Sequence, residues 1–85
     1  MFLHLGNNIM VNMNKIIAIL DLETAADSTA ARNLLNNIVK NKKVENIAEE
    51  GKEKSLIISE GSFYLSPISS NTLLKRSISN GEYEF

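Results

Sequence analysis

A pair of short apolar runs in the last third of the chain constrains its fold more than any other feature. Residues 55–59 read SLIIS and residues 62–66 read SFYLS, and only Glu60 and Gly61 separate them. Two runs of this length around a glycine-containing pair predict a β-hairpin. Pro67 has no amide hydrogen to donate to a neighbouring strand, so the second strand should end there.

A short helix should follow this hairpin. Ser69 or Ser70 can cap its first turn, because a serine hydroxyl accepts a hydrogen bond from an unpaired helix amide. Leu73 and Leu74 are then expected to pack inward. Residues 79–85 contain a glycine and alternating acidic side chains, and they predict a flexible tail.

The first twenty residues predict three strands. Residues 2–5 are apolar and end at a Gly-Asn-Asn turn over residues 6–8, whose members tolerate a positive φ. Over residues 9–14, Ile9, Val11 and Met13 alternate with Met10, Asn12 and Asn14, which is typical of a half-buried strand that pairs back on the first. Residues 16–20 are apolar at every position, so we expect this strand to be buried on both faces and central in the sheet.

An amphipathic helix is expected next. Thr24, Asp27 and Ser28 can each cap its N-terminus, and we favour Asp27 or Ser28. Apolar side chains then recur three or four residues apart, the spacing of one helix face. These positions are Ala31, Leu34, Leu35, Ile38 and Val39.

The elements together predict an α+β fold: a small, mostly antiparallel sheet with one long amphipathic helix and a short C-terminal helix. Residues 44–48 add a further short strand, and the charged residues 49–54 form a solvated loop. We expect one domain over residues 1–78 and a tail over residues 79–85.

Composition favours an assembly of several copies. The chain has 85 residues, and 44% of them are hydrophobic. A domain of this size has a high ratio of surface to volume, so its core cannot easily cover that many aliphatic side chains. We therefore expect part of the apolar surface to be buried between subunits of a homo-oligomer.

Other function classes find little support in the residues. The chain has no cysteine and one histidine, His4, so we expect no metal site, no cofactor and no catalytic triad. Asp21 and Glu23 can serve as acid and base or bind a hard metal, but carboxylates between a strand and a helix more often cap the helix. We expect no enzyme activity and no small-molecule substrate. The sequence shows no membrane span and no signal peptide, which predicts a cytoplasmic protein.

Nucleic acid is the partner class that the charges leave open. The net charge is −1, which disfavours a strongly basic binder. Lys15 precedes the third predicted strand, while Lys52 and Lys54 precede the hairpin. In a monomer these are ordinary surface lysines; in a ring, weak contacts repeated on every subunit can hold one polyanion.

Four segments of the chain carry a family resemblance: MFLHLG at residues 1–6, KIIAILD at 15–21, KSLIIS at 54–59 and, above all, YLSPISSNTLLKRS at 64–77. They resemble the RemA/RemB family of extracellular-matrix regulatory proteins of Gram-positive bacteria, and the RemB branch most closely. The resemblance implies a regulator of biofilm-matrix genes that assembles into a closed ring and binds duplex DNA. In the RemA branch, arginines before the central strand and before the hairpin contact the DNA.

Lysines occupy those places in this chain, at Lys15, Lys52 and Lys54, and Glu53 adds a negative charge. A lysine contacts phosphate as a point charge, without the two-pronged geometry of arginine, so the resemblance implies weaker DNA binding here. Two functions remain open. One is a ring-forming, DNA-binding transcriptional regulator of matrix genes; the other is an oligomeric interaction protein that regulates these genes through a protein partner without contacting DNA.

Overall fold

The predicted hairpin lies at the centre of the molecule. In this computed structural model, which describes residues 1–41 and 43–79, strand β5 spans Ser55–Ser59 and strand β6 spans Ser62–Ser66. They pair antiparallel with Ser55 opposite Ser66 and Ser59 opposite Ser62, so Glu60 and Gly61 form the turn. This confirms the predicted hairpin and its two-residue turn.

Two further strands extend the hairpin into a four-stranded sheet with the order β3-β5-β6-β4. Strand β3, Ile16–Asp21, pairs antiparallel with β5, and β4, Val44–Asn46, pairs parallel with β6. The sheet is therefore mostly antiparallel, as expected, and the predicted strand over residues 44–48 is confirmed in a shorter form.

The prediction that residues 16–20 form the central strand is wrong. Strand β3 lies at an edge of the sheet, and its Ile17 is 67% exposed. Strand β5 is flanked on both sides instead, and its Leu56 and Ile57 are fully buried. A continuous apolar run predicts cover on the two faces of a strand, but it does not reveal which neighbours lie along its hydrogen-bonding edges.

The N-terminal hairpin forms a separate two-stranded sheet. Strands β1, Phe2–Gly6, and β2, Ile9–Asn12, pair antiparallel as predicted. The second strand is shorter than its alternating pattern indicated, because a 3₁₀ turn, η1, spans Met13–Lys15. The side chain of Asn12 caps this turn by accepting a hydrogen bond from the Asn14 amide at 2.9 Å.

Two helices follow β3. The predicted amphipathic helix is α2, Thr29–Asn41, and the Ser28 hydroxyl caps it by accepting a hydrogen bond from the Ala31 amide at 3.2 Å. A one-turn helix, α1, Leu22–Ala25, precedes it and was not predicted. Asp21 caps α1, with its carboxylate 2.9 Å from the Glu23 amide, so this carboxylate has the structural role that we favoured for it.

The last helix, α3, spans Ser70–Ser79, and the Ser69 hydroxyl caps it by accepting a hydrogen bond from the Thr72 amide at 3.2 Å. Leu73 is fully buried as predicted, but Leu74 is 54% exposed, so its predicted inward position is wrong. Successive residues of a helix point about 100° apart, and only one side of α3 faces the protein. The predicted tail, apart from Ser79, lies outside the described residues.

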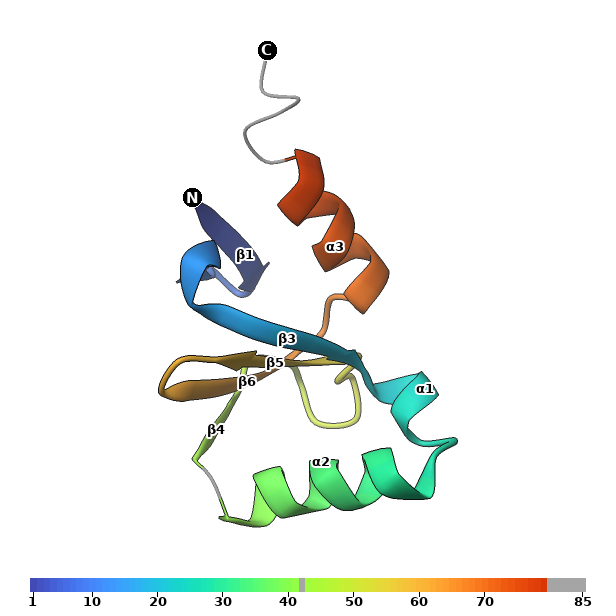
Figure 1. Cartoon of the computed structure of the whole chain (residues 1–85). Helices are drawn as coiled ribbons and strands as arrows, with labels where there is room; N and C mark the ends of the chain where they lie inside the picture. The colour runs from blue at the N-terminus through green and yellow to red at the C-terminus, as the bar shows by residue number, and fades with distance from the viewer. Residues whose placement is uncertain (42, 80–85) are drawn as a thin grey trace.

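Figure 1 shows three layers: α2 lies on one side of the four-stranded sheet, and the N-terminal hairpin with α3 lies on the other. The buried core is on the hairpin side and joins β1, β2, β5 and α3. Its buried members are Leu3, Leu5, Val11, Ile57 and Leu73. The described residues thus form the α+β fold that the sequence predicted.

The α2 side of the sheet is only partly covered. On α2, Ile38 is buried, whereas Leu34 and Val39 are 49% and 50% exposed. Phe2 and Met10 of the N-terminal hairpin are also more than half exposed. A single chain therefore leaves apolar surface in water at both ends of the three-layer arrangement (Figure 1).

Candidate functional site

The loop between β4 and β5 has a defined path because the sheet holds both of its ends. At its start, the Ile47 amide donates to the Leu65 carbonyl at 2.8 Å; at its end, the Lys54 amide donates to the Ser66 carbonyl at 2.8 Å. Between them, the Lys52 amide closes a turn by donating to the Glu49 carbonyl at 2.9 Å. These hydrogen bonds therefore fix the backbone positions from which the charged side chains of this loop extend.

Glu53 is turned toward β4. Its carboxylate accepts a hydrogen bond from the side-chain amide of Asn46 at 2.9 Å. The pKa of Glu53 lies below its usual value, first because the carboxylate accepts a hydrogen bond from its own backbone amide and next because of Asn46. Glu53 therefore stays ionised at neutral pH, with its charge held beside Asn46.

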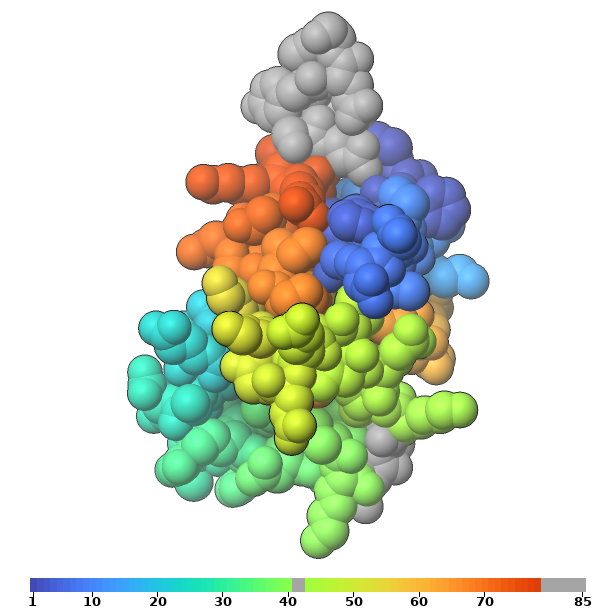
Figure 2. Space-filling model, turned by 180° about the vertical axis from the view of Figure 1, so that it is seen from behind, coloured from blue at the N-terminus to red at the C-terminus, as the bar shows by residue number. Residues whose placement is uncertain are grey.

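Lys52 and Lys54 instead line an open groove of about 630 Å³ beside the loop, which we call the lysine groove. Its walls also include Asn7 from the N-terminal turn and Pro67 from the end of β6. The remaining lining residues are Ile47, Ala48 and Glu49. Figure 2 shows the yellow-green residues of this loop next to the blue N-terminal hairpin.

Lys15 lies elsewhere. Strand β3 pairs with β5 so that Ile16 faces Ser59 at one end, while Asp21 faces Ser55 at the other. Lys15 adjoins the first end, where its carbonyl accepts from the Glu60 amide at 2.8 Å, and Lys54 adjoins the second. The six residues of β3 make five steps along the strand, which place the two ends about 17 Å apart. One chain therefore does not bring the three predicted lysines into a single cationic spot.

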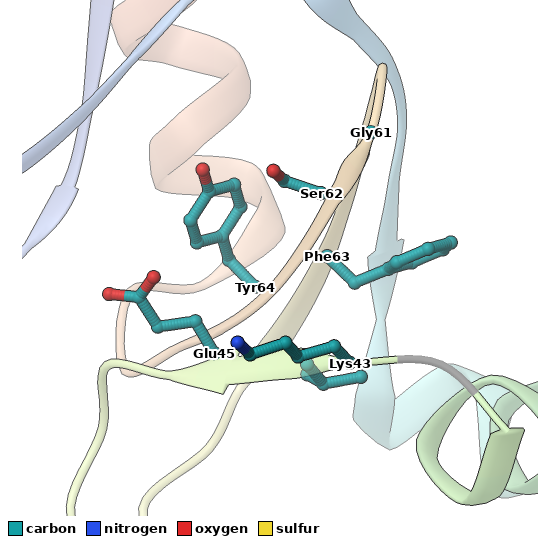
Figure 3. Close-up of a pocket in the computed structure, with 7 residues that line it drawn as sticks. Lys43, Glu45, Gly61, Ser62, Phe63 and Tyr64 are labelled. Atoms are coloured by element: carbon teal, nitrogen blue, oxygen red, sulfur yellow. The ribbon is translucent and has the colours of Figure 1, made fainter.

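A second groove, of about 490 Å³, lies over β4 and β6 (Figure 3). Ser62, Tyr64 and Glu45 present their polar ends on the same side in Figure 3, while Phe63 points away from them. Lys43, Val44 and Gly61 complete its lining. The groove offers a carboxylate, an ammonium group and two hydroxyls on an open surface.

The sequence also offered candidates for catalysis and metal binding, and the structure places them as follows. His4 is half-buried in β1, and its carbonyl accepts a hydrogen bond from the Arg76 guanidinium at 3.2 Å. Over residues 1–41 and 43–79, no three His, Asp or Glu side chains gather closely enough to hold a metal ion. The helices within these residues are too short or too polar to cross a membrane.

Sequence reasoning missed Asn7 and Glu49 as neighbours of the two lysines. The Gly-Asn-Asn segment did reveal a turn, and Asn7 and Asn8 indeed have positive φ values of 48° and 63°. What the sequence could not show is that this turn reaches a loop more than forty residues away. That proximity arises from the docking of the N-terminal hairpin on the end of β6.

Comparison with known proteins identifies the family. A search of curated proteins found no match. The family model described as "RemA-like: Extracellular matrix regulatory protein A-like" matches residues 2–76, which include every described strand, the lysine groove and most of α3. With nearly the whole domain matched, the chain belongs to the RemA-like family of extracellular-matrix regulatory proteins.

Proposed function

We propose that this protein is a ring-forming, DNA-binding transcriptional regulator of extracellular-matrix (biofilm) genes, closest to the RemB branch of its family. Family membership supports the regulatory role. The observation that supports DNA as the partner is the sorting of charges in one loop: Lys52 and Lys54 line an open groove, while Glu53 is held away by Asn46. A protein that binds DNA in a bacterium acts in the cytoplasm.

Duplex DNA fits the groove by charge. Two ammonium groups on an open surface can contact successive phosphates of a backbone, which positions a protein without reading bases. Glu49 lines the same groove and the chain has a net charge of −1, so each subunit contributes little affinity. Repetition around a closed assembly multiplies such weak contacts, because the later ones form at high effective concentration.

The assembly that we propose buries the apolar surface left over in one chain. Strand β3 has a free edge, and beside it lies an apolar groove of about 320 Å³ whose walls include Ile19, Leu20 and Leu34. Phe2 and Met10 are exposed in the layer on the other side of the sheet. Two different apolar surfaces on opposite sides favour head-to-tail contacts, which close into a ring when the rotation permits.

An electrophoretic mobility shift over a salt series tests this function. Binding of duplex DNA should weaken with salt at a log-log slope of about −0.9 for each phosphate neutralised. The double variant Lys52→Glu, Lys54→Glu should abolish the shift and leave the oligomer intact, since both side chains are exposed. Lys40→Glu with Lys75→Glu makes the same charge change at exposed positions outside the groove and serves as the control.

The outcomes separate the alternatives. DNA binding that survives the groove variant but not the control places the contact on the helices. No binding by the unaltered protein at low salt contradicts the proposal and favours the second function, regulation through a protein partner. The exposed apolar side chains and the acidic Glu49 are the features that suit a protein partner.

A further inference from the structure

The turn of the N-terminal hairpin forms the wall of the lysine groove opposite the charged loop, and it is firmly attached to the sheet. The Ser66 hydroxyl donates a buried hydrogen bond to the Leu5 carbonyl at 2.6 Å. Gly6 packs so closely on Pro67 that a Cβ added there would lie 3.2 Å from the Pro67 Cγ. These two contacts fix the position of the next residue, Asn7.

Asn7 supplies the groove with a hydrogen-bond donor. It is exposed, it lines the groove with Lys52 and Lys54, and its side-chain amide has no hydrogen-bond partner among the described residues. A primary amide has two N–H groups, and phosphate oxygens accept hydrogen bonds from such groups. A phosphate between the two walls of the groove would therefore meet ammonium groups on one side and an amide on the other.

We propose that Asn7 is a further phosphate-contacting residue, which holds the DNA backbone in the groove together with Lys52 and Lys54. This inference rests on the proposed function, because it names DNA as the occupant of the groove. The contact needs no change in the shape of the protein, since the turn is already fixed by Ser66 and Pro67. It also explains how two lysines that share their groove with Glu49 can still hold a phosphate in a defined place.

The adjacent residue provides a matched control. Asn8 is also exposed and also has a positive φ, but it is absent from the lining of the groove. Aspartate tolerates this left-handed backbone region nearly as well as asparagine, so neither Asn7→Asp nor Asn8→Asp should disturb the turn. The two variants carry the same added charge one residue apart.

The experiment measures duplex DNA affinity for both variants by fluorescence anisotropy at fixed salt. Asn7→Asp should weaken binding by about tenfold or more, the size expected when a hydrogen bond to a charged group is lost. Asn8→Asp should change it by less than about twofold, as for a screened surface charge. Circular dichroism and light scattering confirm that fold and oligomer are retained.

Three results would overturn the inference, and they differ in what they say of the proposed function. If both variants weaken binding equally, Asn7 acts only through general charge. If Asn7→Asp binds normally while Lys52→Glu, Lys54→Glu does not, DNA occupies the lysine side of the groove without reaching the turn, and the proposed function stands. If the unaltered protein binds no DNA, both the inference and the proposed function fail.

Discussion

Lys52, Glu53 and Lys54 show how neighbouring residues of opposite charge can serve different surfaces. In an extended segment, successive side chains point to opposite sides, so a lysine-glutamate-lysine sequence separates its charges. Here the two lysines reach the groove, and Glu53 reaches Asn46 on β4. The glutamate that weakens the expectation of DNA binding in the sequence is therefore directed away from the groove in the structure.

The hydrogen bonds to Glu53 make a prediction about stability and pH. Because they lower its pKa in the folded state below the ordinary value of 4.5, the ionised carboxylate stabilises the fold above that pH. This contribution is lost as the pH falls through the folded-state pKa. Glu53→Gln should therefore lower the melting temperature at neutral pH, and the difference from the unaltered protein should shrink below about pH 4.5.

Thermal melts at several pH values, at one protein concentration, measure this effect. Glu50→Gln makes the same change of charge on an exposed side chain of the same loop, and it serves as the control. A difference for Glu53→Gln that stays constant between neutral and acidic pH would show that the carboxylate charge has no part in holding the loop.

At the scale of elements, the sequence was sufficient wherever one local pattern determines one element. The turn at Glu60 and Gly61 and the serine caps at Ser28 and Ser69 depend on residues that are close in the sequence, and all are confirmed. Strand order is different. The apolar side chains of β3 and β5 look alike in the sequence, and only the path of the whole chain makes one an edge and the other central.

Prediction of the lysine groove from the sequence has the same limitation. Lys52 and Lys54 could be selected from their place before the hairpin, and in the structure both line one groove. Asn7 could not be selected in this way, because its approach to the groove depends on how the N-terminal hairpin docks on Pro67. Lys15 was grouped with the other lysines only on the condition that the strand ends meet, and β3 separates them instead.

The docking of the N-terminal hairpin on Pro67 can be tested at Gly6. Its φ of 113° suits glycine alone, and a Cβ would also press on the Pro67 ring at 3.2 Å. Gly6→Ala should therefore destabilise the fold by about 1–3 kcal/mol, which lowers the melting temperature by several degrees. Gly51→Ala is the matched control, because its φ is also positive, at 83°, but apart from Gly51 and its two chain neighbours no described atom lies within 4 Å of the added Cβ.

Gly6→Ala should thus cost more stability than Gly51→Ala when both are measured by thermal or urea unfolding. The difference between them reports the contact with Pro67, since both substitutions introduce a strained backbone. Equal losses would mean that the hairpin turn can move away from Pro67 at little cost, and the turn would then be a poor platform for Asn7.

At the scale of the whole molecule, the exposed apolar side chains of α2 indicate a surface for a partner subunit. Leu34 and Val39 flank the buried Ile38, so the helix has more apolar surface than its own sheet covers. Leu34 and Val39 are each already about half covered, so full burial of one of them against another subunit gains about half of the roughly 1.5–3 kcal/mol that a fully exposed side chain would gain. A stable ring needs several such contacts at each interface.

Light scattering coupled to gel filtration should therefore report a closed homo-oligomer, and removal of this surface should break it. Leu34→Gln with Val39→Gln adds no charge, so any loss of DNA binding in that variant comes from loss of the assembly. Asn33→Gln with Asn36→Gln places the same side chain at exposed polar positions of the same helix and should leave the oligomer unchanged.

Loss of the assembly should also remove DNA binding. Subunits that stay folded but no longer assemble should lose nearly all affinity for duplex DNA, because each has only a small cationic groove with a glutamate in its wall. A folded monomer that binds DNA as tightly as the unaltered protein would show that one groove suffices, and repetition around a ring would then not explain the binding. A monomeric unaltered protein at roughly tens of micromolar, a concentration at which interfaces of standard size are populated, would exclude the ring itself.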